Sequence, residues 1–338
     1  MIDQPDRVIV VRVANWLGDT VMALPALAAL RAARPDARIT VIGRWAPLLS
    51  GQAVADILLP YPRELGERLR LGRALRGDRP DLALLLPNSL ESVLAACWWG
   101  AGRRVGFDTD GRRRLLTDPV ARPSPRHHQV DEYGALVAAA AGVRVGEDLT
   151  PIWRRAERPA IEAEVDTLLT EAGVSPAARV VGLHLGASFG RSKLWPAESF
   201  GRLATRILRD GFSPLLLGTP GERDTAHAVS KAAGAPPPSL VGRDRPALLA
   251  SLLARLSCLV SGDTGVAHLA AALGVPTVTL FGPTDPRLTK PRGTGARVLY
   301  RAVPCSPCFL PSCPIDHICL RRIEVEEVAA HVRQAAGA

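Results

Sequence analysis

The tract Ser261–Pro286 reads SGDTGVAHLAAALGVPTVTLFGPTDP. It begins where the apolar, β-branched run 256–260 gives way to an Ala- and Leu-rich stretch of helical period. Glycine just after a helix and proline soon after it are the usual signs of a helix end, and Gly274 and Pro276 have these positions. The tract therefore predicts a strand–helix–strand unit of a parallel α/β sheet, with the helix over 264–273.

The tripeptide Gly-Asp-Thr of this tract, at 262–264, also occurs at 18–20, directly after the β-branched run 8–13. In open α/β sheets, ligands bind beyond the carboxyl ends of the strands, and helix N-termini attract anions. Two such strand-to-helix switches, one in each half of the chain, predict two nucleotide-fold domains that face a shared cleft.

The rest of the chain alternates between strand-like and helical periods. Strands are expected at 7–13, 38–43, 56–60, 81–86, 103–106, 179–184, 213–218, 238–241, 257–261 and 276–281. Helices are expected at 20–33, 64–76, 88–99, 130–141, 159–172, 196–210, 222–233, 246–255, 264–273 and 325–334. The predicted domains are 1–155 and 179–322, with a linker or helix at 156–178 and a C-terminal helix at 323–338 that packs back on the first domain.

The composition sets broad limits. At 338 residues and 47% hydrophobic, the chain can fill two cores, and no run approaches the roughly 18 apolar residues of a spanning helix. The N-terminus enters a strand directly, so no secretory signal is expected. The net charge of +9 comes mainly from arginine, which clusters at 103–128. No nucleic-acid-binding motif accompanies it, so an anionic membrane surface or a phosphorylated acceptor is favoured, and a solvated basic loop stays an alternative.

Residues at the second Gly-Asp-Thr have the chemistry of an anion site. Asp263 or Thr264 can cap the following helix, which leaves its first backbone N–H groups free to point at a ligand, and Gly265 permits close approach. His268 lies one turn further on. A well-capped crossover helix with a buried histidine explains the same spacing equally well.

Two other strand ends add to this site. The loop 185–195 is rich in Gly and Ser, includes Ser188 and carries Lys193, so its N–H groups and its cation suit a pyrophosphate. It is neither a G-x-G-x-x-G nor a Walker loop. Glu222, at the start of a helix after the next strand, can accept hydrogen bonds from ribose, although an acid at a helix N-terminus needs no ligand.

Several motifs resemble those of a known family. They are Lys-x-Trp-Pro at 193–196, Gly-Asp-Thr-Gly-x-x-His within 262–276, Phe-Gly-Pro-Thr-Asp-Pro at 281–286, and Trp-Leu-Gly-Asp at 16–19. Together they resemble the ADP-heptose–lipopolysaccharide heptosyltransferases over nearly the whole chain. The segment 86–92, LPNSLES, looks like the acceptor side of the heptosyltransferase II branch, although Glu91 stands where relatives often have a basic residue.

This resemblance implies a GT-B fold of two Rossmann-like domains with a hinge, and an inverting, metal-independent enzyme that uses ADP-heptose. It implies that Ser188 and Lys193 contact the diphosphate beside the Asp263-Thr264-Gly265 turn and His268, and that Glu222 meets the ribose. Asp19 becomes the base that deprotonates the acceptor hydroxyl. Its alternative role is to cap the helix that follows.

The acceptor implied by the resemblance is the lipopolysaccharide inner core. The residues expected to bind this acceptor are Asn88, Ser89, Arg103, Arg104 and His127. The basic ones among them, together with Arg126 and His128, are suited to its phosphates or acidic sugars. The resemblance also implies a cytoplasmic enzyme, peripheral on the inner face of the inner membrane, with no nucleic-acid partner.

The cysteines form a separate pattern. Cys97 and Cys258 are interpreted as buried thiols, whereas Cys305, Cys308, Cys313 and Cys319 cluster as C-x2-C-x4-C-x5-C around His317. In a cytosolic chain this spacing favours a structural zinc or iron over disulfides, and reduced packed thiols stay an alternative.

The resemblance thus implies a heptosyltransferase, and its branch implies the second enzyme of that kind in lipopolysaccharide core assembly. Three alternatives stay open: a GT-B transferase with another nucleotide sugar or with a protein or small-molecule acceptor; an NAD-dependent oxidoreductase, which the missing G-x-G-x-x-G disfavours; and a non-catalytic nucleotide-binding module.

Overall fold

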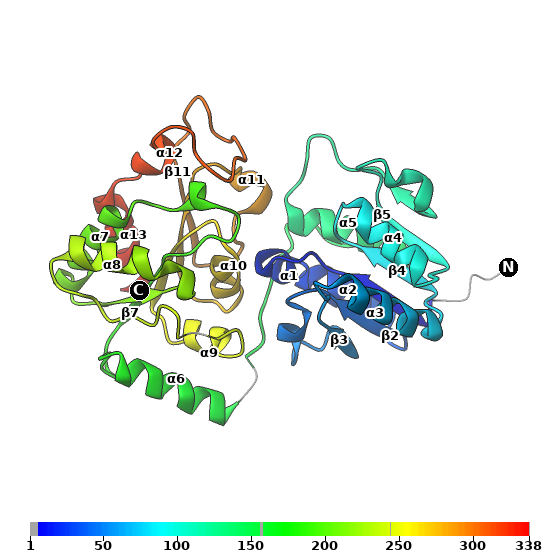
Figure 1. Ribbon diagram of the computed structural model, residues 1–338, viewed down its shortest axis with the longest axis horizontal. Helices are drawn as coiled ribbons and strands as arrows, with labels where there is room; N and C mark the ends of the chain where they lie inside the picture. The colour runs from blue at the N-terminus through cyan, green and yellow to red at the C-terminus, as the bar shows by residue number, and fades with distance from the viewer. Residues whose placement is uncertain (1–5, 156–157, 244, 338) are drawn as a thin grey trace. The chain divides into compact units, whose positions relative to one another are not determined.

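The computed structural model describes residues 6–155, 158–243 and 245–337. The chain divides into two compact units, Met1–Ile152 and Trp153–Ala338, and each unit is built on its own parallel sheet (Figure 1). The predicted domain boundary at 155/156 adjoins residues 156–157, which lie outside the described residues.

The first unit contains a six-stranded sheet of order β3-β2-β1-β4-β5-β6. Its strands are β1 (Val8–Arg12), β2 (Arg38–Ile42), β3 (Ile57–Leu59), β4 (Leu82–Leu85), β5 (Arg103–Phe107) and β6 (Asp118–Val120). The central strands are almost wholly buried, as expected of a parallel sheet covered on both faces. Sequence analysis missed β6, because a three-residue edge strand that contains Pro119 carries no strand pattern.

All predicted helices of the first unit are present, but the first of them is divided in two, and two short 3-10 helices were not predicted. They are α1 (Leu17–Met22), α2 (Leu24–Ala33), η1 (Ala46–Leu49), α3 (Leu65–Asp78), α4 (Leu90–Trp98), η2 (Arg112–Leu115) and α5 (Gln129–Ala141). The single helix predicted over 20–33 begins earlier and is two helices divided at Ala23. Pro25 lacks an N–H group, so the first helix cannot continue its hydrogen bonds through that turn.

The second unit contains a five-stranded sheet of order β11-β10-β9-β7-β8. Its strands are β7 (Val180–His184), β8 (Ser213–Leu217), β9 (Cys258–Gly262), β10 (Thr277–Phe281) and β11 (Ala296–Tyr300). The predicted strand 238–241 is wrong: only an isolated bridge joins Ser239 to Leu216. The edge strand β11 was not predicted.

The remaining helices belong to the second unit. They are α6 (Pro159–Glu171), η3 (Arg191–Lys193), α7 (Ala197–Arg209), η4 (Pro220–Glu222), α8 (Arg223–Ala233), α9 (Leu249–Leu253), α10 (Gly265–Ala272), α11 (Pro286–Thr289), α12 (Ile318–Arg321) and α13 (Val325–Ala336). Helix α6 occupies the predicted linker. It packs against α9 and is joined to Arg255 by Glu162 and Asp166, at 2.8 and 2.9 Å.

The C-terminal helix corrects a prediction. Its apolar stripe of Val325, Val328, Ala329 and Val332 is buried in the core of the second unit, where α13 packs against α7, β9 and β10. Its residues therefore belong to the second unit, and the expected packing on the first domain is wrong. An amphipathic helix stripe identifies a buried face but not the surface that buries it.

Candidate functional site

The order of the second sheet has a switch point between β7 and β9, where successive crossovers run in opposite directions. Open α/β sheets bind ligands at such a point, beyond the carboxyl ends of the strands. His184 ends β7, and Ser261 lies beside it in β9, with 3.3 Å between the Ser261 hydroxyl and His184 Nδ1. The loops that follow these two strands carry Lys193 and Asp263.

Lys193 and Asp263 form the central ion pair of this edge. Lys193 Nζ lies 2.5 Å from Asp263 Oδ2 and donates to the Asp263 carbonyl at 3.2 Å. The Thr284 hydroxyl donates to the same carboxylate oxygen at 2.7 Å. The side chains of Lys193 and Asp263 are 12% and 6% exposed. An ammonium group has three donors, so this geometry leaves one of them for a ligand.

The start of α10 departs from the prediction that Asp263 or Thr264 caps it. Thr264 has the N-cap position, but its hydroxyl lies 2.9 Å from the Ser261 hydroxyl and makes no capping bond. Asp263 is held by Lys193 and Thr284 instead. The first N–H groups of α10, beginning at Gly265, therefore have no side-chain cap, which is the condition for an anion site. His268, one turn on, is 5% exposed.

Gly262 lets the two loops approach closely. A Cβ atom at this position would lie 2.7 Å from the Lys193 carbonyl oxygen, so the backbone of β9 touches the backbone that carries the lysine. The centroid of the Phe189 ring lies 4.8 Å from Lys193 Nζ, which is within the range of a cation–π contact. Ser188 is exposed in the same loop.

Glu222 has the local role that its position predicts. Its Oε2 accepts from the Thr219 N–H at 2.7 Å and from the Thr219 hydroxyl at 2.6 Å, which closes a capping box around η4. The carboxylate also lies against Gly186 and Gly218, at the carboxyl ends of β7 and β8. Both carboxylate oxygens of Glu222 therefore lie at the edge of the sheet where open α/β sheets bind ligands.

The cysteine-rich segment 305–319 packs against the loop that carries Lys193. Ser192 donates through its N–H to the Pro311 carbonyl at 3.1 Å and through its hydroxyl to the Leu310 carbonyl at 2.5 Å. At Gly190 an added Cβ atom would lie 2.2 Å from the Pro311 oxygen. The segment thus fixes the backbone on either side of Arg191.

The structure does not support the metal site expected at the C-terminal cysteine cluster. Among the residues that the structure describes, no three His, Cys, Asp or Glu side chains are grouped so that they could hold a metal ion. Cys258 is a buried thiol, as predicted, and burial raises its pKa to about 12. Cys97 is only partly buried, which corrects the prediction for that residue.

The first sheet has its switch point between β1 and β4, and Asp19 lies in the first turn of α1, just beyond β1. The N-cap position belongs to Trp16, so Asp19 does not cap the helix. Tyr133, from α5, donates to Asp19 Oδ1 at 2.8 Å. Burial and the neighbouring carboxylate raise the pKa of Tyr133 well above its usual value, so the phenol stays a donor. Sequence analysis missed Tyr133, since nothing in the motif signals it.

Arg12 is a second residue that sequence analysis missed. It ends β1 and is 2% exposed, and burial lowers the pKa of its guanidinium. Its Nη2 donates to Asn15 Oδ1 at 3.0 Å, and its guanidinium lies 3.8 Å from the ring centroid of Tyr61. It therefore ties the β1–α1 turn, which leads into the helix that carries Asp19, to the end of β1.

The loop after β4 brings Asn88 and Ser89 to the same switch point. Ser89 caps α4 by accepting from the Ser92 N–H at 3.4 Å, whereas the buried Oδ1 of Asn88 has no hydrogen-bond partner among the described residues. Arg112 fixes the loop from below: it donates to the carbonyl of Pro87 at 2.5 Å and to the hydroxyl of Ser92 at 2.9 Å.

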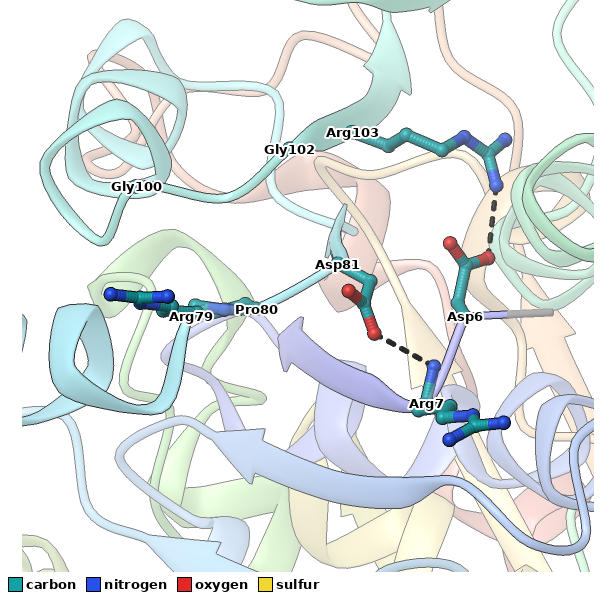
Figure 2. A pocket seen from close by; sticks show the side chains of 8 residues that line it. All are labelled: Asp6, Arg7, Arg79, Pro80, Asp81, Gly100, Gly102 and Arg103. Carbon is teal, nitrogen blue, oxygen red and sulfur yellow. Dashed lines mark hydrogen bonds and ion pairs between the residues drawn. The ribbon is translucent and has the colours of Figure 1, made fainter. Parts of the chain in front are cut away.

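Arg103 and Arg104 lie elsewhere. They begin β5, at the amino edge of the sheet, whereas Asp19, Asn88 and Ser89 lie beyond carboxyl ends. Arg103 lines a cavity of about 470 Å³ at that edge and pairs with Asp6 at 2.9 Å (Figure 2). Arg104 donates to the carbonyls of Ala101 and Leu115, at 2.8 Å each. Both arginines are thus engaged in the fold, and the structure does not bring them to Asp19.

His127 is exposed just before α5, the helix that supplies Tyr133. Its neighbour Arg126 is held by the fully buried Glu132 at 2.8 Å, and His128 caps the helix by accepting from the Val130 N–H at 3.3 Å. The chain before α5 is therefore firmly anchored, while the His127 ring is open to solvent.

Comparison with known proteins agrees with this geometry. Residues 68–319 match the family model described as glycosyltransferase family 9 (heptosyltransferase). The chain belongs to this family. The transferase is 30% identical over 297 residues to lipopolysaccharide heptosyltransferase 2 of Salmonella typhimurium, and to the protein of the same name from Escherichia coli; each alignment covers 84% of this chain and 85% of the relative.

Among solved structures, the transferase is similar to that of the E. coli ADP-heptose lps heptosyltransferase II, with a TM-score of 0.80 and 26% identity over 98% of both chains. The prediction of a GT-B fold, made of two Rossmann-like domains with parallel sheets, is confirmed.

His184 makes the stability of the transferase sensitive to acid. Burial lowers the pKa of His184 from 6.5 to about 4, so the folded chain keeps it neutral where an unfolded histidine takes up a proton. The contribution of His184 to the free energy of unfolding is therefore fully present above pH 6.5. We expect up to about 3 kcal/mol of that free energy to be lost as the pH is lowered to 4. His184→Gln should lose less stability over this interval, as measured by urea unfolding at pH 7 and 4.5. Equal losses in both proteins would contradict this assignment.

Proposed function

We propose that this transferase moves L-glycero-D-manno-heptose from ADP-heptose to the inner core of lipopolysaccharide, as a heptosyltransferase II. The observation that carries the proposal is the Lys193–Asp263 pair beside the uncapped start of α10, at the switch point of the second sheet. A cation next to free backbone N–H groups suits a diphosphate. The relatives named above supply the donor and acceptor.

On the donor side, the free hydrogen of Lys193 and the N–H groups from Gly265 onward bind the diphosphate of ADP. Ser188 and the edge of His268 add polar contacts to it. Glu222 accepts from the ribose hydroxyls through the oxygen that Thr219 leaves free. These groups neutralise the charge that grows on the departing ADP, so the proposed reaction needs no metal or other cofactor.

On the acceptor side, Asp19 takes the proton of the attacking hydroxyl. The hydroxyl oxygen forms a bond to the anomeric carbon of the heptose, the bond from that carbon to the diphosphate oxygen breaks, and ADP leaves with the electron pair. Attack on the side opposite the leaving group inverts the anomeric carbon. Asn88, with its unpartnered Oδ1, Ser89 and His127 contact the acceptor sugar. Arg103 and Arg104 are left out of this role because they lie at the amino edge.

The proposed acceptor is anchored in a membrane, so the enzyme would work at the cytoplasmic face of the inner membrane. No helix among the described residues is long and apolar enough to cross a bilayer. Peripheral attachment is therefore the form of membrane association that we propose.

The proposal is tested by incubating the purified transferase with ADP-heptose and a heptose-deficient core acceptor. The expected result is release of ADP and a product heavier by one heptose, detected by mass spectrometry. Thermal shift with ADP, UDP and GDP distinguishes donors, and the largest stabilisation is expected with ADP. Stabilisation by ADP without transfer or donor hydrolysis would favour a non-catalytic nucleotide-binding module, and preference for UDP would favour another donor sugar.

Tyr133→Phe probes the partner of the proposed base. The tyrosine hydroxyl donates to the charged carboxylate of Asp19, and a hydrogen bond of this kind favours the charged form. We expect kcat to fall about tenfold and the acid limb of the kcat/KM profile to move to higher pH. Tyr300→Phe, in the second unit, is the matched control. An unchanged pH profile in Tyr133→Phe would show that Asp19 does not need this donor.

A further inference from the structure

Helices α3 and α4 expose large apolar side chains to solvent. Leu65 and Leu69 of α3 are 70% and 42% exposed, and Leu90, Leu94 and Trp98 of α4 are 45%, 51% and 39% exposed. On each helix these residues are four apart, so they share one face. Scattered single leucines are ordinary on a surface, but a stripe on each of two neighbouring helices is not.

The two stripes are adjacent because the helices pack side by side. Arg68, near the start of α3, lies 3.7 Å from Glu91 near the start of α4. Further along, the indole of Trp98 covers Gly72 so closely that a Cβ atom there would lie 2.1 Å from the ring. Gly72 continues the helical row of Leu65 and Leu69, so Trp98 joins the two stripes into one apolar surface.

Arginines border this surface. The segment 63–79 contains six arginines and three acidic residues. Arg76 continues the row of Leu65 and Leu69, and Arg73 lies next to that row. Arg63, Arg70, Arg73 and Arg76 are exposed, and no ion-pair partner for them is found within the described residues. The surface is therefore both apolar and cationic.

We propose that this α3–α4 surface docks the transferase on an anionic phospholipid bilayer. Leucine and tryptophan side chains insert at the boundary of head groups and acyl chains, and arginines beside them bind lipid phosphates. Both helices begin at the carboxyl edge of the first sheet, the edge that carries Asp19. Leu65 and Leu90 lie in the first turns of these helices, so docking through the α3–α4 surface also brings that edge toward a sugar that projects from the bilayer. The inference deepens the proposed function, since it rests on an acceptor that is anchored in lipid.

The test is flotation of the full-length protein with vesicles of phosphatidylcholine, alone or mixed with phosphatidylglycerol. Binding is expected only to the mixed vesicles and should weaken as salt is raised. Leu69→Glu/Leu94→Glu and Arg73→Glu/Arg76→Glu should each weaken binding at least about tenfold. The controls are Leu208→Glu and Arg202→Glu/Arg209→Glu, which change exposed residues of α7 in the second unit and should bind normally.

Transfer assays separate this proposal from the proposed function. With a deacylated, water-soluble acceptor, the α3–α4 variants should turn over like the wild type, whereas transfer to the same core embedded in vesicles should fall. Soluble transfer by a wild type that binds no vesicles would overturn the docking surface and leave the transferase assignment standing. Vesicle binding without any heptose transfer would overturn the transferase assignment and leave the docking surface standing. Self-association that the variants abolish, in a protein that ignores vesicles, would also overturn the docking proposal.

Discussion

Asp19→Asn is expected to lower kcat for heptose transfer by about 10²–10⁴-fold, the usual contribution of a positioned general base. Asparagine keeps the size of the side chain and can still accept from Tyr133, but it cannot take the proton of the acceptor hydroxyl. The measurement is initial-rate release of ADP at saturating donor and acceptor. The affinity for ADP, measured by calorimetry, should change less than about twofold, because the residue acts on the acceptor.

Asp36→Asn is the matched control, since Asp36 is an exposed acid of the same unit. Its turnover should equal that of the wild type. If Asp19→Asn keeps wild-type turnover, the base is another carboxylate. If instead it loses ADP affinity in proportion to its turnover, Asp19 acts on the donor.

Lys193→Met is expected to lower kcat by about 10²–10³-fold and to weaken ADP binding. The diphosphate then lacks the ammonium group that Lys193 places beside it. The same change also leaves the carboxylate of Asp263 buried without its cation, which costs stability. Turnover and unfolding free energy must therefore be measured together.

The double variant Lys193→Met/Asp263→Asn separates the two effects. Removing both charges should recover most of the stability lost in the single variant, because no uncompensated charge stays buried. It should not recover turnover, because the diphosphate still lacks its cation. Lys231→Met, an exposed lysine on α8, should leave both quantities unchanged. Recovery of turnover in the double variant would contradict a direct role for Lys193.

Most elements of the fold could be predicted because parallel strands buried on both faces require unbroken β-branched and apolar runs. β1, β4 and β9 are such strands, and each was predicted within one or two residues. The edge strands β6 and β11 were missed, whereas the edge strands β3 and β8, which contain apolar runs, were predicted. The stretch 238–241 has the sequence of a strand, yet in the structure it makes only one bridge.

The candidate site could be predicted only in part. Lys193 and Asp263 were assigned to one site, and the structure brings them to 2.5 Å across 70 positions of sequence. Their contact was not predicted, and neither was the diversion of Asp263 and Thr264 from capping α10 to Lys193 and Ser261. Arg103 was expected near the acceptor because it is basic, but position along a strand, rather than charge, decides which edge of the sheet a residue reaches.

By itself, the sequence determined the class of fold, the places where strands give way to helices, and the family, because buried periodicity and short motifs are local properties of the chain. Only the tertiary structure decided which side chains meet. Strand order placed Asp19 and Asn88 at one switch point, although β1 and β4 are far apart in sequence. It likewise joined Tyr133 to Asp19 across 114 positions. Such contacts depend on how the strands are ordered in the sheet, and no local pattern records that order.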